Sequence, residues 1–343
     1  MADIHQKNKM VIGQLRSALY DLNADALPGQ LKEIFHPDCE IHLAYPFKDL
    51  TGPGELYERA YQPLIEAVPD LERRDYIVIA GPSVADSNWV GCCGNYVGVF
   101  ERPWLDIPPT FHPVVMRFHE FYRLEEGKVM EMQALWDIPQ VMMQARAWPM
   151  TPSLGVEWVV PAPATQDGIV PSPRDEEQSA RSLQLVQDMI AGLLRFAEGG
   201  HEGMNMEAYW HPKMTWYGPA GIGTNRRLSG FRNWHQVPWL KAMPDRGIVE
   251  SVNHYYFSDG PYVAVTAWPG MKCTITHDGL LGIPPTGKEL TMCSLDFWRC
   301  ENGTLRENWV LVDILDVYNQ LGVDVFSRMR EISVGRQQKR PHI

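Results

Sequence analysis

The sequence lacks the features that would place the protein in a membrane or on nucleic acid. No apolar run reaches the ~18 residues that a membrane-spanning helix needs, and the polar N-terminal residues show no signal peptide. Positive charge is also in deficit: 31 Lys and Arg face 42 Asp and Glu, for a net charge of −11. Because negative charge repels phosphate, the composition argues against nucleic acid and anionic membrane surfaces as partners. We therefore expect a cytoplasmic protein.

Signatures of metals and nucleotides are missing as well. The six cysteines show neither CxxC spacing nor an accompanying histidine pair, so buried, reduced thiols are the simplest interpretation. There is no HExxH motif, no Gly-rich dinucleotide fingerprint, no P-loop and no serine nucleophile elbow. The sequence thus predicts no metal and no cofactor, and leaves acid/base chemistry carried by side chains.

What the sequence does contain is an internal repeat. Residues 107–145 align without gaps to residues 283–321, and 15 of the 39 aligned residues are identical. The Ile-Pro-Pro-Thr block recurs at an offset of 176, and His36-Pro37 recurs as His211-Pro212 at an offset of 175. A chain of 343 residues has room for two ordinary domains. The repeat therefore predicts a tandem duplication.

The composition between the copies predicts the domain boundaries. Residues 149–178 hold six prolines, a density that favours extended backbone and a semi-rigid linker. Within this stretch the apolar group Val156, Trp158, Val159 and Val160 should pack along one domain. We expect a first domain over 1–148, a linker over 149–178, a second domain over 179–331 and a basic tail over 332–343.

Each copy shows the same order of predicted elements. Apolar spacing predicts helices at 10–22 and 27–35 in the first copy and at 182–198 and 204–210 in the second. Alternating strands follow, with Glu-Asn-Gly at 301–303 as a hairpin turn. Helices followed by an antiparallel sheet are typical of an α+β fold, in which a curved sheet wraps a pocket against the helices.

Two blocks of the second copy resemble a known family. Residues 276–288 (THDGLLGIPPTGK) and the pattern of residues 296–322 (Asp-Phe-Trp-Arg, Gly303, Glu307, Trp309, Asp313, Gln-Leu-Gly) resemble SnoaL-like polyketide cyclases of the nuclear-transport-factor-2-like superfamily. The resemblance implies two cone-shaped α+β barrel domains. It also implies packing of the two copies through their sheets as an intramolecular pseudo-dimer, since members commonly dimerise that way, with a further homo-oligomer left open.

The first copy is more diverged from this pattern. Phe111 replaces the glycine after Ile-Pro-Pro-Thr, Gln133 replaces Trp309, and Tyr96 stands near the position of His277. We therefore expect the second copy to carry most of any turnover.

The resemblance and the strand pattern together indicate the candidate site residues. Asp137 and Asp313 stand where the last strand meets the closing helix. The resemblance implies a general acid/base at this position, whereas a helix N-cap is the structural alternative. Glu120 and Asp296 align with each other one strand earlier as a second acid. His277 lies in the recognised block and completes the predicted catalytic set.

The predicted substrate-binding set comes from strands next to these acids. On the last strand, Glu307 and Trp309 share a face with Asp313, and Glu131 takes the same place in the first copy. The alternative for both glutamates is pairing with Arg123 and Arg299 across the hairpin. The other members are His42 and Tyr217 on the first strand, as hydrogen-bond donors to a developing oxyanion, and the aromatic residues Tyr96 and Trp298.

These residues predict a cofactor-independent lyase, isomerase or cyclase that acts on a small carbonyl-type substrate of apolar or aromatic character. One alternative is an epoxide hydrolase, a chemistry also found in this superfamily, which would need an arginine inside the pocket between two acids. Arg123 and Arg299 alternate onto the wrong face for that role. The other alternative is a non-catalytic ligand-binding module, whose acids would all be locked in salt bridges.

Overall fold

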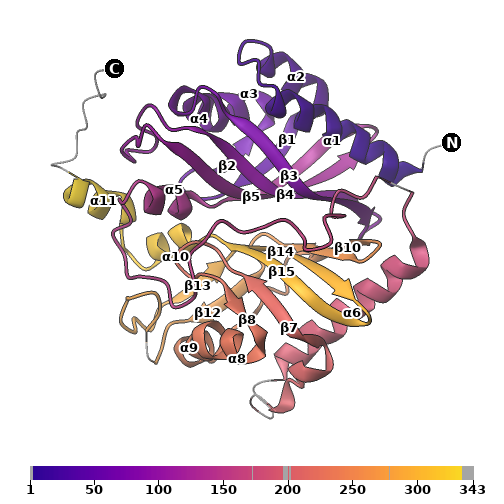
Figure 1. Ribbon diagram of the computed structural model, residues 1–343, viewed down its shortest axis with the longest axis vertical. Helices are drawn as coiled ribbons and strands as arrows, with labels where there is room; N and C mark the ends of the chain where they lie inside the picture. The colour runs from indigo at the N-terminus through magenta and orange to yellow at the C-terminus, as the bar shows by residue number, and fades with distance from the viewer. Residues whose placement is uncertain (1–2, 172, 196–199, 201, 278, 334–343) are drawn as a thin grey trace.

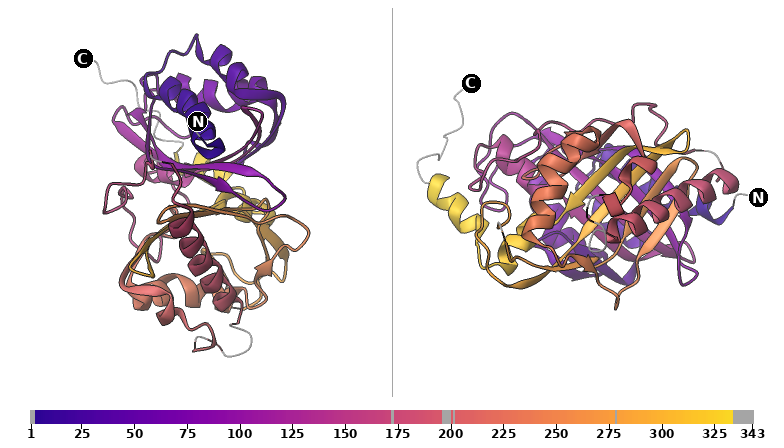
Figure 2. Two further views of the ribbon diagram at one scale, coloured as in Figure 1. Left: turned by 90° about the vertical axis from the view of Figure 1, so that its right-hand side faces the viewer. Right: turned by 90° about the horizontal axis from the view of Figure 1, so that it is seen from below.

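The computed structural model describes residues 3–171, 173–195, 200, 202–277 and 279–333. It consists of two α+β copies stacked through their sheets, with the helices on the outside (Figures 1 and 2). We call the part through α5 the first copy and the part from α6 onward the second copy. None of the described helices combines the length and the hydropathy that crossing a membrane requires.

The first copy places six helical segments against a six-stranded sheet. The helices are α1 (Ile4–Tyr20), α2 (Leu27–Ile34), α3 (Gly52–Leu56), the π-helix η1 (Tyr57–Tyr61), α4 (Gln62–Ala67) and α5 (Ile138–Gln144). The strands are β1 (Phe35–Leu43), β2 (Lys48–Thr51), β3 (Glu72–Pro82), β4 (Asn88–Val99), β5 (Pro113–Glu125) and β6 (Lys128–Trp136). Their order across the sheet is β2-β1-β6-β5-β4-β3.

The second copy repeats this plan with a split sheet. Its helices are α6 (Glu176–Leu194), η2 (Met206–Ala208), α8 (Arg227–Phe231), η3 (Arg232–Gln236), α9 (Val237–Ala242), α10 (Ile314–Gln320) and α11 (Val325–Ser333). A six-stranded sheet has the order β10-β11-β14-β15-β7-β8, and a three-stranded sheet has the order β13-β12-β9. The strands are β7 (Trp210–Tyr217), β8 (Asn225–Arg226), β9 (Gly247–Ile248), β10 (Tyr255–Asp259), β11 (Tyr262–Thr266), β12 (Met271–Thr274), β13 (Glu289–Met292), β14 (Ser294–Glu301) and β15 (Thr304–Val312).

Local sequence explains how the long outer helices begin. The side chain of Asp3 accepts a hydrogen bond from the backbone N–H of Gln6, and Asp175 does the same for Gln178 at the start of α6. Each aspartate satisfies a backbone donor that the first helical turn leaves free. Apolar side chains such as Ile12 and Leu15 then bury one face of α1 against the sheet.

The two tandem α+β domains that the sequence predicts are confirmed. Their sheets are mixed and open rather than antiparallel and closed into a barrel. In the first copy β1 runs parallel to β6, and in the second β7 runs parallel to β15. A parallel pair needs a long crossover. In each copy the helices and strands between the two paired strands form that crossover. Each large sheet keeps two edges rather than closing.

The two sheets pack face to face and share one apolar layer. Phe121 and Leu135 of the first copy contact Phe297 and Leu311 of the second within this layer. The rings of Phe121 and Phe297 lie 4.9 Å apart. The copies therefore form the intramolecular pseudo-dimer that a shared sheet interface produces.

The segment between the copies runs along both of them. Ile169 bridges to Val78 in the first copy, and Val156 bridges to Thr224 in the second. Val160 is buried in the layer between the sheets, as expected for an apolar linker residue. Val156, Trp158 and Val159 are each more than half exposed, although Trp158 stacks on Tyr217 of the second copy with ring centres 6.3 Å apart.

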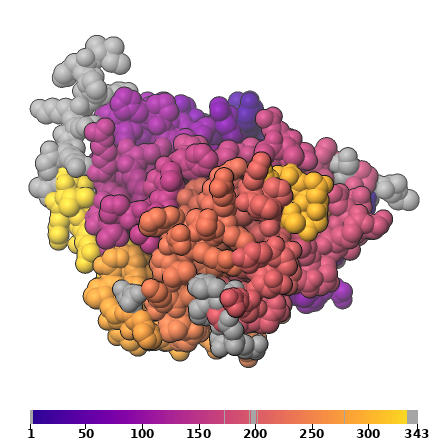
Figure 3. All heavy atoms as spheres, turned by 60° about the horizontal axis from the view of Figure 1, so that its bottom comes forward, coloured from indigo at the N-terminus to yellow at the C-terminus, as the bar shows by residue number. Residues whose placement is uncertain are grey.

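The C-terminal helix α11 was not predicted, and it crosses back to the first copy. Its Val325, Phe326 and Met329 belong to the core of the first copy, and Phe326 packs on Tyr45 with ring centres 6.1 Å apart. In Figure 3 this yellow helix lies against the magenta atoms of the first copy. Residues 334–343 of the predicted tail lie outside the described residues.

Candidate functional site

A cavity of about 180 Å³ lies in the interior of the second copy. Most of its wall is apolar, from α6, α9 and strands β9 to β12. The lining residues are Ile190, Leu193, Leu240, Pro244, Arg246, Gly247, Ile248, His254, Tyr256, Val265, Ala267, Gly270, Met271, Ser294 and Asp296. One buried water needs roughly 10–15 Å³ by this measure, so the cavity has room for a small organic ligand.

Asp296 is the carboxyl group of this cavity. It lies on β14, two residues after Ser294, so both side chains point to the same face of the strand. The Ser294 hydroxyl donates a hydrogen bond to Asp296 Oδ1 at 3.0 Å. Burial raises the pKa of Asp296 to about 7, and only the Ser294 hydrogen bond acts against it among the described residues. A carboxyl group with such a pKa can take up and release a proton near neutrality.

Three further polar side chains line the same cavity. His254 is half-buried, and its Nε2 lies 3.2 Å from the carbonyl oxygen of Val249. Burial, followed by the negative charge of Asp296, raises the pKa of Tyr256 to about 12, so its hydroxyl stays protonated. Burial also lowers the pKa of Arg246, although the guanidinium remains charged.

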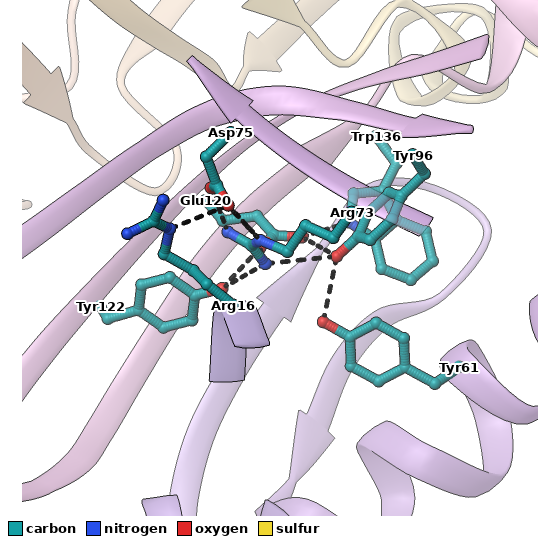
Figure 4. A network of polar contacts seen from close by, with 8 residues as sticks. All are labelled: Arg16, Tyr61, Arg73, Asp75, Tyr96, Glu120, Tyr122 and Trp136. Atoms are coloured by element: carbon teal, nitrogen blue, oxygen red, sulfur yellow. Dashed lines mark hydrogen bonds and ion pairs between the residues drawn. The ribbon is translucent and has the colours of Figure 1, made fainter. Parts of the chain in front are cut away.

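In the first copy, Glu120 occupies the place of Asp296 and is fully buried. Figure 4 shows four side chains converging on its carboxylate. Tyr96 and Trp136 donate to Oε1 at 2.9 Å each, while Arg73 and Tyr122 donate to Oε2. Every acceptor direction of Glu120 is thus taken by the protein itself.

Arg73 occupies the space where a ligand would otherwise lie. Its guanidinium pairs with Asp75 at 3.0 Å and stacks over the Phe118 ring at 4.3 Å. Arg16 of α1 holds the other oxygen of Asp75 at 2.9 Å (Figure 4). The cavity that remains beside Tyr96 has a volume of only about 10 Å³, which is one water at most.

Strand register shows which residues replace this network in the second copy. In the first sheet, Arg73 lies opposite Tyr96 on the neighbouring strand, and Tyr96 lies opposite Met116. Met116 aligns in sequence with Met292 of the second copy. There Met292 lies opposite Met271, and Met271 lies opposite Ile248. Three of the four donors to Glu120 therefore have apolar counterparts: Arg73 is replaced by Ile248, Tyr96 by Met271 and Trp136 by Val312. Tyr122 is replaced by Trp298, whose indole N–H forms no hydrogen bond among the described residues. Tyr96 thus corresponds to Met271 rather than to a residue near His277. The fifth change, Phe118 to Ser294, opens the cavity further.

Asp137 and Asp313 lie between the copies rather than in the cavity. Asp313 Oδ2 accepts from the backbone N–H of Tyr45 at 2.8 Å, and Asp137 Oδ2 accepts from that of Ala220 at 3.0 Å. Asp313 Oδ1 also caps α10 by accepting from Asp316. Both carboxyl groups line one gap of about 10 Å³. Burial raises the pKa of Asp137 to about 6 and that of Asp313 to about 7.

In each copy, the face of the last strand that was expected to line the pocket packs against the other copy instead. Trp309 and Leu135 lie in the layer between the sheets, whereas Ala134 and Trp136 face the core of the first copy. Trp309 donates its indole N–H to the Pro161 carbonyl. The period of two separates the two faces correctly, but it does not tell which face is the concave one.

Glu131 and Glu307 form the ion pairs that were the alternative to substrate binding. Glu131 accepts from Arg123 at 3.0 Å, and Glu307 accepts from Arg299 at 2.6 Å. The hydroxyl of Tyr217 also donates to Glu307, at 3.0 Å. This group lies near the layer between the sheets and does not border the cavity of the second copy.

The remaining predicted residues are dispersed. His42 is half-buried, lies 2.7 Å from Asp49 and stacks on Trp268. His277 is exposed and bonds its neighbour Thr276. Trp298 is buried in the apolar core of the second copy. The structure therefore places Asp296 alone of the predicted set on the cavity of about 180 Å³ in the second copy.

Sequence reasoning missed Arg73, Arg246 and Ser294. The alternating pattern predicts a strand over 75–80, whereas β3 begins at Glu72, so the prediction left Arg73 outside the sheet. The Arg-x-Asp spacing of Arg73 and Asp75, which puts both side chains on one face of a strand, was the available signal. For Arg246 no sequence signal exists, since it follows α9 in a turn. Among the described residues, no three His, Cys, Asp or Glu side chains lie close enough together to hold a metal ion.

Comparison with known proteins identifies both copies. The family model of the SnoaL-like polyketide cyclases matches residues 14–145 and 194–321. No curated protein matches the chain at a significant level.

Solved structures that resemble the chain each correspond to about one copy. IdmH from Streptomyces antibioticus, described as a polyketide cyclase, is 18% identical, with 40% of this chain covering 96% of that one and a TM-score of 0.34. A SnoaL-like protein from Jannaschia sp. CCS1 is 21% identical, with 42% covering 94% and a TM-score of 0.33. AclR from Streptomyces galilaeus, described as a hydroxylase, is 22% identical, with 42% covering 97% and a TM-score of 0.32.

Proposed function

Because the chain belongs to the SnoaL-like polyketide cyclase family, we propose that its second copy is a lyase, isomerase or cyclase that needs no cofactor. The substrate is a small carbonyl compound with an apolar or aromatic body. The observation that supports this proposal is Asp296, a carboxyl group with a pKa near 7 on an apolar cavity. A cavity of mostly apolar walls with a few converging polar groups is the usual form of a small-molecule site.

In the proposed reaction Asp296 acts as base and then as acid. Its carboxylate removes a proton from the carbon next to the substrate carbonyl, and the electron pair of that C–H bond moves onto the carbonyl oxygen. Protonated Asp296 then returns the proton to carbon or oxygen, which regenerates the carboxylate. Ser294 holds Oδ1 at 3.0 Å, so Oδ2 is the oxygen left to exchange the proton.

Tyr256 is suited to stabilise the enolate. Tyr256 lines the same cavity, and its raised pKa keeps its hydroxyl a hydrogen-bond donor when Asp296 is ionised. A donor aimed at an oxygen that gains charge lowers the barrier most strongly where water is excluded.

We propose no turnover for the first copy. Its acid Glu120 is held by four donors, and the cavity beside one of them, Tyr96, holds at most one water. That is the arrangement expected of a non-catalytic module. It also bears on the epoxide hydrolase alternative: Arg73 does lie between two acids, Asp75 and Glu120, but the site leaves no space for an epoxide.

The proposal can be tested without the natural substrate. Purified protein is mixed with small aryl ketones such as 2-indanone and acetophenone in D₂O, and exchange of the hydrogens next to the carbonyl is followed by NMR. We expect protein-dependent exchange, and a fall of roughly 10²–10⁴-fold in the Asp296→Asn variant, the usual worth of a positioned proton-transfer group. Wild-type exchange at the buffer rate across the ketones, or undiminished exchange in Asp296→Asn, contradicts the proposal.

A further inference from the structure

Arg246 is a cation on the cavity wall without a protein partner. It follows α9 and precedes β9, and it lines the cavity together with Asp296. Among the described residues no side chain forms a hydrogen bond or an ion pair with its guanidinium, and burial lowers its pKa. Arg246 is half-buried, so its guanidinium keeps part of its contact with water and gives up the rest without a counter-ion from the described residues. The free protein therefore carries an unpaired cation on the wall of a mostly apolar cavity.

The acids near Arg246 are engaged elsewhere. Asp245 is exposed and accepts a hydrogen bond from the backbone N–H of Thr274 at 2.9 Å. Asp296 forms no hydrogen bond or ion pair with Arg246, and its side-chain partner among the described residues is Ser294. The charge of Arg246 lowers the pKa of His235. The cavity wall thus carries a cation and a titrating carboxyl group that are not paired with each other.

The first copy shows what a guanidinium inside this fold normally receives. Arg73 is fully buried and pairs with two carboxylates, Asp75 and Glu120. Arg246 is half-buried and has neither. Because no described side chain supplies its counter-ion, the position is suited to an anionic group of a ligand in the cavity.

We propose that Arg246 binds a carboxylate of the substrate, so that the site takes small keto acids or aryl carbonyl acids. The carboxylate lies at Arg246 while the carbon next to the carbonyl lies at Asp296. The planar fork of a guanidinium matches a carboxylate through two parallel hydrogen bonds. A single arginine among apolar walls balances one negative charge, which favours a carboxylate over a phosphate dianion. The placement of the reacting carbon at Asp296 rests on the proposed function, whereas the binding of the carboxylate by Arg246 does not.

The test compares two probes that differ only in charge. Binding of 4-acetylbenzoate and of 4-acetylbenzamide is measured by calorimetry at pH 8. We expect the acid to bind wild-type protein about tenfold to a hundredfold more tightly than the amide, as a charge-assisted pair inside a protein would give. Arg246→Met should abolish this preference, and Arg246→Lys should keep part of it because the charge remains.

Lys272→Met provides the matched control. Lys272 is exposed on β12 next to Met271, so it removes the same charge from the opposite face of the strand. Its preference for the acid should equal that of the wild-type protein. The proposal is overturned if wild-type protein does not prefer the acid, if Arg246→Met keeps the preference, or if 4-acetylphenyl phosphate binds more tightly than 4-acetylbenzoate. The first and third comparisons use wild-type protein and do not depend on the folding of a variant.

Asp296→Asn separates this inference from the proposed function. This variant should lose the ketone exchange yet keep the preference for the acid, because Arg246 is intact. Loss of exchange without any preference for the acid would end the carboxylate assignment alone. A preference for the acid without protein-dependent exchange would end the proposed reaction alone.

Discussion

Glu120 in the first copy and Asp296 in the second hold the same position on β5 and β14, and they differ by one methylene group. Glu120 is fully buried and held by two tyrosines, a tryptophan and an arginine. Asp296 receives one hydrogen bond, from Ser294, and lines an apolar cavity. The chemistry available to a carboxyl group in this fold is thus decided by its neighbours rather than by its position.

The comparison also explains how a duplicated chain can contain unequal copies. The two copies share a large apolar layer between their sheets, and α11 of the second copy completes the core of the first. The first copy stabilises the second through these contacts whether or not it binds a ligand. A buried ion-pair network in place of its cavity is therefore compatible with a role as a structural partner.

The largest effect should come from the Glu120→Gln variant of the first copy. This change removes the charge of Glu120 and puts an amide NH₂ where donors of the network need an acceptor, while Asp75 still pairs with Arg73. Breaking a buried ion pair costs about 3–5 kcal/mol. We expect a loss of this size in the free energy of unfolding, measured by urea denaturation, with ketone exchange retained in the folded fraction. Asp296→Asn should show the reverse: lost exchange and no loss of stability.

Stability in Glu120→Gln equal to that of the wild-type protein would show that the Arg73 network contributes little. Loss of exchange in the folded variant would show instead that the first copy takes part in turnover. Either result would remove the distinction between the two copies.

The sequence predicted the repeat and the pairing of Glu120 with Asp296, because the 176-residue offset holds without gaps over the last two strands. It did not reveal that Ile248 of the second copy corresponds to Arg73 of the first. The alignment offset between the copies is not constant in this region, and β9, which carries Ile248, is only two residues long. Nor could it assign the faces of β15. Alternation shows that Trp309 and Asp313 share a face of the strand. It does not show whether that face lines a pocket or packs against the other copy, as it does here.

Asp313→Asn should have an intermediate effect, and it tests the catalytic role that the family resemblance implies. Asp313 accepts one hydrogen bond at each oxygen, from Tyr45 of the first copy and from Asp316 at the start of α10. Asparagine has one acceptor oxygen, so one buried N–H loses its partner at a cost of about 1–3 kcal/mol. We expect this loss in urea denaturation and ketone exchange within about twofold of wild type. A fall in exchange of roughly 10²–10⁴-fold with stability unchanged would restore Asp313 as the acid/base.

The smallest effect concerns pH and again separates the two acids. The pKa of Asp296 is about 7 in the folded protein, against about 3.9 for an unfolded aspartate. Between these values the folded state holds a proton that the unfolded state has released, so the stability of the wild-type protein falls as pH rises and levels off above pH 7.

Asp296→Asn lacks this titration. The difference in unfolding free energy between wild type and Asp296→Asn should therefore shift against wild type by about 1–2 kcal/mol from pH 5 to pH 8, less than the full pKa difference implies because water in the cavity screens the charge. Asp137 and Asp313 also have raised pKa values, but they are present in both proteins and cancel in the difference. Parallel stability curves for the two proteins over this pH range would show that Asp296 is ionised throughout, and a carboxyl group of that kind could not serve as the acid in the second half of the reaction.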